Sequence, residues 1–159
     1  MLQRIQTVFL FLVSIMMVLY IVFPVWVGAN AEATITHRLY ALFYYQVADN
    51  GSQEIVNYLP YAASGGLAIL SIVIAFIEIF SFKNRMTQIK LGALNAFIIS
   101  ASLVSMIWFT TQLHELWPDS AGRYAIGVFF PVIALICNMI ANRFIRKDER
   151  LVKSMNRIR

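Results

Sequence analysis

Cysteine is almost absent from this chain of 159 residues, which contains only Cys137. A membrane thiol oxidoreductase needs a pair of cysteines, such as CxxC, so a single thiol excludes that class of enzyme. Histidine is rare too, since the sequence contains only two. These residues, His37 and His114, are far apart in the sequence and lack the spacing of a metal or haem motif. Since the sequence also lacks a glycine-rich phosphate loop and a nucleophile with its base, we expect no catalytic site, no metal site and no cofactor.

Charge is scarce as well, because 13% of the residues are charged and 60% are hydrophobic. A mean hydropathy of +0.70 lies outside the range of soluble globular proteins and predicts an integral membrane protein. Four apolar runs can each cover much of a hydrocarbon layer about 30 Å thick: Thr7–Val27, Tyr61–Ile77, Leu91–Leu113 and Tyr124–Ala141. The sequence therefore predicts an all-α membrane protein, a single domain over 1–159 in which a bundle of four transmembrane helices occupies approximately 5–28, 60–82, 87–114 and 122–147.

The first apolar run has features of a cleaved secretory signal, because Arg4 precedes it and Ala29-Asn30-Ala31 resembles a cleavage site. Its uncharged stretch is about 21 residues long, however, whereas a signal core has about 7 to 15. We therefore predict a retained transmembrane helix. Pro24 and Pro131 lack a backbone N–H and are predicted to bend the first and fourth helices.

The lysines and arginines gather on one side of the predicted bundle. Of the 13 basic residues, all except Arg38 and Arg123 fall in the two terminal segments or in the short connection between the second and third helices. The opposite side holds most of the acidic residues: Glu32, Asp49, Glu54, Glu115 and Asp119. By the positive-inside rule, both termini are predicted to be cytoplasmic.

The predicted extracytoplasmic loop over 29–59 is too long for a simple connection. Two β-prone, aromatic-rich runs flank Asp49-Asn50-Gly51, and Asn-Gly between such runs is typical of a hairpin, because both residues tolerate positive φ. We predict a small hairpin or sheet over the outer helix ends. The tyrosines near it are interpreted as an interfacial aromatic belt rather than a ligand-binding surface: Tyr40, Tyr44, Tyr45, Tyr58 and Tyr61.

A few polar residues fall within the apolar runs or next to them. Asn95, Asn138 and Asn142 are predicted to point into the bundle and to form hydrogen bonds between helices. Glu78 lies near the cytoplasmic end of the second helix, where we predict an ion pair with Lys83 or Arg143 in preference to proton or ion coupling. Small residues mark predicted helix contacts: Ala62 and Gly66 on the second helix, and Gly92, Ala96 and Ser100 on the third.

The cytoplasmic tail over 143–159 carries a basic stripe. With 3-4-3-4 spacing, five cations share one face of a predicted amphipathic C-terminal helix that continues the fourth span: Arg143, Arg146, Arg150, Lys153 and Arg157. Clusters of 4 to 8 basic residues beyond a span are typical of binding to anionic lipid headgroups. Docking to a partner protein is a second interpretation, through an apolar stripe on the same helix. Nucleic acid is disfavoured, because the tail lacks interleaved aromatic residues.

Three stretches, "MLQRIQTVFLFL", "KNRMTQIKLGALN" and "ANRFIRKDERLVKSMNRIR", resemble a family of small bacterial four-helix membrane proteins known only as a domain of unknown function. The resemblance covers nearly the whole chain and implies a multi-pass protein of the bacterial inner (cytoplasmic) membrane. It implies no activity and no catalytic residue. We therefore expect a noncatalytic structural or accessory component of a membrane assembly, in a larger complex or a homo-oligomer. The alternative is a small transporter or channel that uses Glu78 and the intramembrane asparagines.

Overall fold

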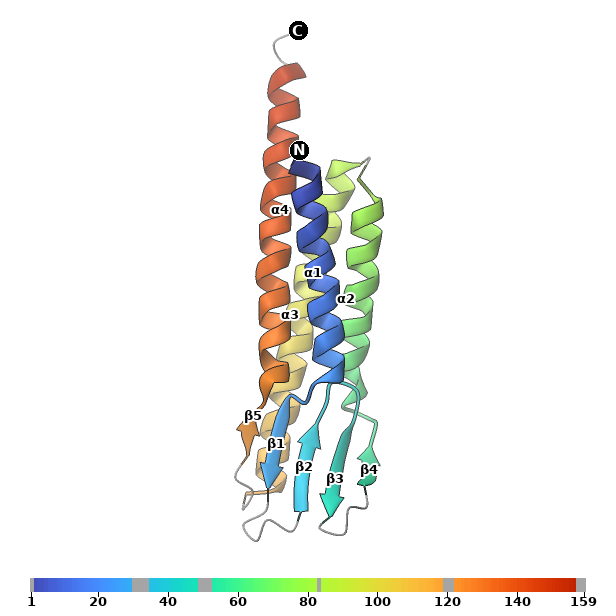
Figure 1. The fold of residues 1–159 in the computed structure, drawn as a ribbon, viewed down its shortest axis with the longest axis vertical. Coiled ribbons are helices and arrows are strands. Elements are labelled where there is room, and N and C mark those ends of the chain that lie inside the picture. The colour runs from blue at the N-terminus through green and yellow to red at the C-terminus, as the bar shows by residue number, and fades with distance from the viewer. Residues whose placement is uncertain (1, 30–34, 49–52, 83, 119–121, 157–159) are drawn as a thin grey trace.

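The computed structural model describes residues 2–29, 35–48, 53–82, 84–118 and 122–156. Four long helices lie side by side along one axis, and short strands lie together at one end of them (Figure 1). Each of the four is long and apolar enough to cross a membrane. The predicted four-helix architecture is confirmed, with these bounds: α1 (Leu2–Val22), α2 (Ala62–Phe80), α3 (Arg85–Leu116) and α4 (Phe129–Asn156).

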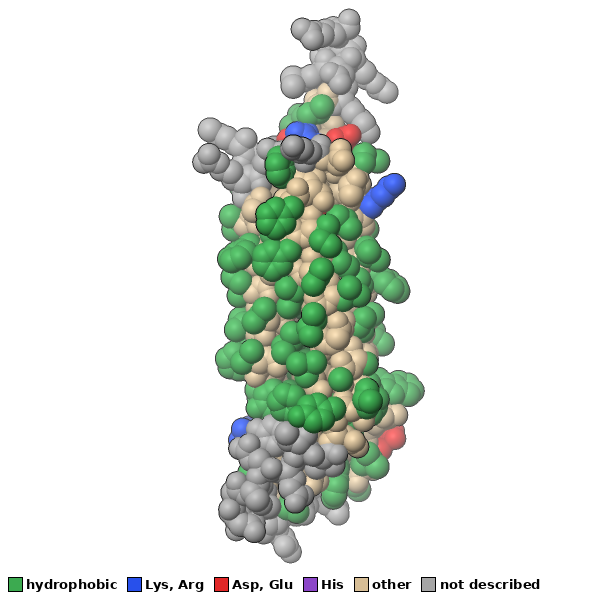
Figure 2. Space-filling view, turned by 90° about the vertical axis from the view of Figure 1, so that its right-hand side faces the viewer, with side chains coloured by type: hydrophobic (Ala, Val, Ile, Leu, Met, Phe, Trp, Pro, Cys, Tyr) green, Lys and Arg blue, Asp and Glu red, His purple; other side chains and the backbone are tan. Residues whose placement is uncertain are grey.

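The helices form a closed ring, because α1 contacts α2 and α4, and α3 contacts the same two helices. Each helix turns one stripe inward at helical spacing, as Leu10, Val13, Met17 and Tyr20 do on α1. Large hydrophobic side chains remain exposed on the outside of the bundle. Figure 2 shows such side chains over the middle of one face, with the charged ones that it colours above and below them. Apolar faces of this kind suit a lipid environment.

The strands form a five-stranded antiparallel sheet in the order β4-β3-β2-β1-β5. Their bounds are β1 (Trp26–Ala29), β2 (Ile35–Leu39), β3 (Tyr44–Ala48), β4 (Gln53–Asn57) and β5 (Arg123–Tyr124). The pairing of β3 with β4 confirms the predicted hairpin, although its turn over 49–52 lies outside the described residues. The predicted small sheet is also confirmed, and it includes β1 and β5 in addition to the loop strands.

The structure corrects the ends of the first and fourth predicted helices. α1 stops at Val22, just before Pro24, and the segment Trp26–Ala29 pairs with β2 instead of extending the helix to residue 28. A residue before proline is disfavoured in the α conformation, so Pro24 ends α1 rather than bending it. α4 begins at Phe129, after a 3-10 turn over Ile126–Val128, so Pro131 lies in its first turn, where a missing N–H costs little.

The sheet packs on the end of the bundle through aromatic rings. Trp26 of β1, Leu39 of β2 and Tyr44 of β3 are buried against two residues of α3, and Tyr61 packs against this group. Tyr44 is only 3% exposed, so it belongs to the sheet–helix core rather than to an interfacial belt. Tyr58, in contrast, is exposed, while the side chain of Tyr45 lies outside the described residues.

The basic tail continues α4 as one unbroken helix to Asn156. This part of α4 keeps the direction of the bundle and projects past the start of α1 (Figure 1). An ion pair of 3.3 Å between Arg85 and Asp148 ties the start of α3 to α4, and the same arginine donates a hydrogen bond of 3.0 Å to the Asp148 carbonyl oxygen. The predicted amphipathic tail is therefore a straight extension of the fourth span, held beside α3 as far as Asp148.

Candidate functional site

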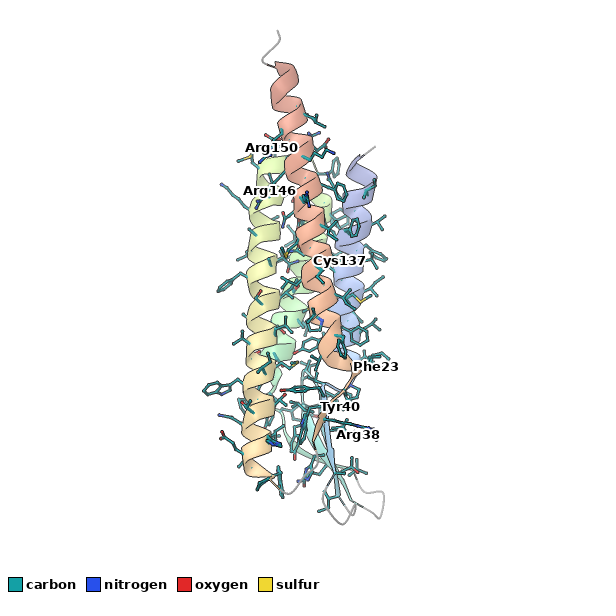
Figure 3. The ribbon with its side chains drawn as sticks, turned by 90° about the vertical axis from the view of Figure 1, so that its left-hand side faces the viewer. Phe23, Arg38, Tyr40, Cys137, Arg146 and Arg150 are labelled. Atoms are coloured by element: carbon teal, nitrogen blue, oxygen red, sulfur yellow. The ribbon has the colours of Figure 1, made fainter. Side chains whose placement is uncertain are left out.

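The basic side chains predicted on the tail follow one side of α4. Arg143, Arg146 and Arg150 are exposed, and the structure adds Lys147 to the same side. Figure 3 shows Arg146 and Arg150 on the part of α4 that lies toward its C-terminal end. The side chain of Lys153 and all of Arg157 lie outside the described residues.

A groove of about 740 Å³ lies between α3 and α4 beneath these cations. Two small residues of α3, Ala93 and Ala96, and Met139 of α4 make its apolar part, while Asn142 separates that part from the basic residues. The basic part of the lining is Arg143, Arg146, Lys147 and Arg150. Positions 143, 146, 147 and 150 share one face of a helix, so helical spacing could also have indicated Lys147, which the predicted stripe left out. The partner helix that makes the face into a groove is supplied by the fold.

Acidic residues of α4 face away from this groove. Asp148 pairs with Arg85, and Glu149 lines a different surface depression with Asn84 and Met86. Asp148 forms its ion pair with Arg85 of α3 and not with a cation of the groove. The groove therefore combines a positive rim with an apolar floor, which is a lining complementary to an anionic amphiphile.

The predicted intramembrane asparagines lie inside the bundle and bond to neighbouring helices. Asn95 of α3 is 0% exposed and its Oδ1 accepts a hydrogen bond of 2.7 Å from Ser71 of α2. Asn138 of α4 is also 0% exposed and donates a hydrogen bond of 2.9 Å to the carbonyl oxygen of Gly92. Asn142 lies against Gly92, so closely that a Cβ there would collide with its amide, and its Oδ1 has no partner among the described residues.

Glu78 of α2 is 0% exposed, and neither carboxyl oxygen has a hydrogen-bond partner in the described part of the chain. The predicted ion pair with Arg143 is absent, because Arg143 is exposed beside the groove and forms no ion pair there. Lys83, the other predicted partner, lies outside the described residues. A carboxylate buried without a partner is unfavourable, so this interior favours the neutral acid at Glu78.

Two buried glutamines near this end of the bundle were not predicted from the sequence. Gln88 of α3 donates a hydrogen bond of 3.0 Å to the Glu78 carbonyl oxygen, and Gln6 of α1 is 4% exposed with its amide nitrogen unpaired among the described residues. The spacing of Gln88, Gly92 and Asn95 could have indicated a shared inward face. Gln6 and Gln88 were missed because each lies beside charged residues at the end of its span.

The two histidines have separate surroundings. His37 of β2 is buried, and its Nδ1 lies 2.6 Å from the Tyr44 hydroxyl and 3.2 Å from the Gln46 amide nitrogen. Burial lowers the pKa of His37 and raises the pKa of Tyr44, which favours a neutral imidazole that accepts from the neutral hydroxyl. His114 is exposed in a surface groove beside Glu115 and Tyr124. No group of three or more His, Cys, Asp or Glu side chains suited to a metal ion occurs among the described residues.

Cys137 is a free, buried thiol of α4. Figure 3 shows it on the same helix as Arg146, further from the C-terminal end. A buried lone thiol in apolar surroundings is a poor nucleophile, so it packs as a small hydrophobic side chain.

Comparison with known proteins shows to which family the chain belongs. No curated protein matches the chain. A family model described as "Domain of unknown function (DUF4293)" matches residues 2–158, which is nearly the full length of the bundle, the sheet and the basic extension of α4. On that match, the chain belongs to the DUF4293 family.

Proposed function

We propose that this protein is a noncatalytic structural or accessory component of a membrane assembly. The observation that carries the proposal is the filled interior of the bundle, where Glu78, Asn95 and Asn138 are all 0% exposed. Solvent therefore does not reach the three polar side chains that a conduction path would use. The two asparagines instead link pairs of helices, which is a packing role.

The proposed assembly would contact the protein at the two ends of the bundle. At one end, exposed apolar side chains follow the edge strand β4, at Tyr58 and Leu59, and end α3, at Leu116. At the other end, the extension of α4 projects beyond the bundle (Figure 1). We place the protein in the bacterial inner membrane with both termini cytoplasmic, since the described basic residues at the α4 end support that orientation. Its partners are then anionic lipids and either a larger complex or a second copy of the chain.

Crosslinking at chosen positions tests the assembly. A photoreactive residue would replace Leu59 at the sheet end, Val152 on the extension of α4, or Val104 on the outside of α3, all of which are exposed. We expect protein crosslinks of defined mass from Leu59 or Val152 in native membranes and lipid adducts from Val104. Lipid adducts alone at all three positions, together with a monomeric mass in lipid nanodiscs, would contradict the proposal.

A second candidate function, a small transporter or channel, is favoured by one observation. Glu78 is a fully buried carboxyl group without a partner among the described residues, and such a group is a frequent proton or ion site in transporters. The test is proton flux into vesicles that contain the protein and a pH-sensitive dye. Flux that exceeds that of empty vesicles, and that Glu78→Gln abolishes, would favour transport over the assembly role.

A further inference from the structure

The groove between α3 and α4 changes its chemistry along its length. From Met139 to Arg150, about 16 Å along α4 at about 1.5 Å per residue, the lining passes from apolar side chains through Asn142 to four cations. The lower part belongs to the apolar span of α4, and the upper part belongs to its basic extension. The groove therefore crosses the level at which hydrocarbon gives way to headgroups.

We propose that this groove is a binding site for one anionic phospholipid, whose acyl chain lies along Ala93, Ala96 and Met139 and whose phosphate contacts the cations of α4. The proposal deepens the lipid part of the proposed function, because it replaces a diffuse basic surface by a site of defined shape. It requires only a bilayer around the bundle and no protein assembly. The lipid site and the proposed assembly role can therefore be contradicted separately.

The apolar floor is suited to an acyl chain. Ala93 is exposed and Ala96 is half-buried, so α3 presents only methyl groups where longer side chains occupy much of its outer face, as Phe97 and Val104 do. Met139 of α4 is 62% exposed on the other wall. Small residues on one wall leave room for a chain, and the flexible thioether on the other can adapt to it.

The basic rim is suited to a phosphate diester. Its cations span residues 143 to 150, about 10 Å along the helix, and the lining contains no carboxylate. None of the four is neutralised by an ion pair within the described ranges. Arginine and lysine in this arrangement can contact the phosphate from several directions, as basic pockets at the cytoplasmic ends of membrane helices do.

Asn142 supplies a second, independent observation. It is 8% exposed, lines the groove at the boundary between the apolar and the basic parts, and has an Oδ1 without a partner in the described structure. In the proposed pose, the ester groups of the lipid pass this level between the acyl chain and the phosphate, so the polar amide of Asn142 lies where the lipid is itself polar. The position therefore fits the ester region of a phospholipid better than an apolar molecule.

Native mass spectrometry of the full-length protein tests the site. The protein would be released from nanodiscs that contain equal amounts of phosphatidylglycerol and phosphatidylcholine. We expect one retained phosphatidylglycerol per chain, preferred at least tenfold over phosphatidylcholine. Arg146→Gln should weaken retention about fivefold, as expected for the loss of about 1 kcal/mol per basic residue. Lys90→Gln, which removes an exposed cation of α3 outside the groove, should leave retention unchanged.

A substitution that leaves all charges in place separates the site from general surface attraction. Ala93→Phe should fill the floor and abolish retention, whereas Val104→Phe places the same side chain at another exposed position of α3 and should have no effect. Unchanged retention in Ala93→Phe, or equal retention of the two lipids by the unaltered protein, would overturn the proposal. If Ala93→Phe does not fold, the comparison of Arg146→Gln with Lys90→Gln still decides the outcome. A protein that retains the lipid but is always monomeric would contradict the assembly role and leave this site intact.

Discussion

Glu78 shows how much one carboxyl group depends on its neighbours. The sequence places it next to a basic connection, which favours an ion pair, whereas the structure buries it completely inside the bundle. Whether Glu78 forms an ion pair or is buried depends on whether it faces the interior of the bundle. The packing of α1 and α3 against α2 decides which face of α2 is turned inward. The difference has a measurable consequence, because replacing the carboxyl group by an amide destabilises a buried ion pair strongly and a neutral acid only slightly.

We expect Glu78→Gln to change the free energy of unfolding by less than about 1 kcal/mol, because the amide has the shape and neutrality of the protonated acid. Removal of one partner of a buried ion pair would instead cost about 3 to 5 kcal/mol. Chemical denaturation in mixed micelles measures the difference. Glu115→Gln, at an exposed position, is the control. A loss of more than 3 kcal/mol in Glu78→Gln alone would show that the carboxylate is charged and paired.

His37 makes the sheet sensitive to pH. Burial lowers its pKa in the folded state below the usual value of 6.5, so the unfolded chain binds more protons at mildly acidic pH. Stability is therefore fully present above about pH 6.5, falls as the pH drops below that value, and levels off below the folded-state pKa. We expect the Tm of the unaltered protein to fall more between pH 7.5 and 5 than the Tm of His37→Gln.

The control for this prediction is His114→Gln, which removes the other histidine from an exposed position. It should keep the pH dependence of the unaltered protein. If His37→Gln and the unaltered protein lose the same Tm on acidification, the imidazole is not the group responsible.

At the scale of the helices, contacts between α3 and α4 depend on one glycine. A Cβ at Gly92 would collide with the side chain of Asn142, whereas a Cβ at Gly66 of α2 would meet no atom within 4 Å. We expect Gly92→Ala to reduce the free energy of unfolding by about 1 to 3 kcal/mol through overpacking. Gly66→Ala should be neutral or stabilising by up to about 1 kcal/mol, because alanine favours the helix. Equal effects of the two substitutions would mean that α3 and α4 are not in this close contact.

The elements differ in how far the sequence predicts them. Four spans follow from run length alone, since a bilayer admits only helices or closed barrels, and the hairpin follows from Asn50-Gly51. The sequence predicts helix where β1 forms, because Trp26 and Val27 continue an apolar run. Hydrophobic periodicity alone does not separate a short apolar strand from the end of a helix. On α2, Gly66 was predicted at a contact although Gly65 is the one that packs closely, because both are small and adjacent.

The groove lies beyond what one helix pattern can predict. The basic stripe of α4 follows from helical spacing, so Arg143, Arg146 and Arg150 were predicted together. Ala93 and Ala96 become part of the same site only because α3 packs beside α4. Such neighbours depend on how the four helices are ordered in the ring, which apolar periodicity does not specify.

At the scale of the whole molecule, apolar and charged side chains are distributed unevenly along the axis of the bundle. On the face shown in Figure 2, apolar side chains cover the middle of the bundle and charged ones lie toward its two ends. Most of the described cations are at the end with the extension of α4. Basic residues resist translocation across a membrane, so in the proposed inner-membrane location we expect this end to remain in the cytoplasm and the sheet to lie on the opposite side.

We expect a cysteine at the sheet end to be accessible from outside the cell and one at the opposite end to be inaccessible. Tyr58→Cys and Met86→Cys, at exposed positions at opposite ends of the bundle, would be made in a Cys137→Ala background. A membrane-impermeant maleimide should label Tyr58→Cys in intact cells with a permeable outer membrane, and Met86→Cys only after the inner membrane is opened. Val104→Cys, at an exposed position in the middle of α3 that we expect to face lipid, is the control that should react poorly in both cases. Labelling of Met86→Cys but not Tyr58→Cys in intact cells would establish the inverted orientation, with the sheet in the cytoplasm.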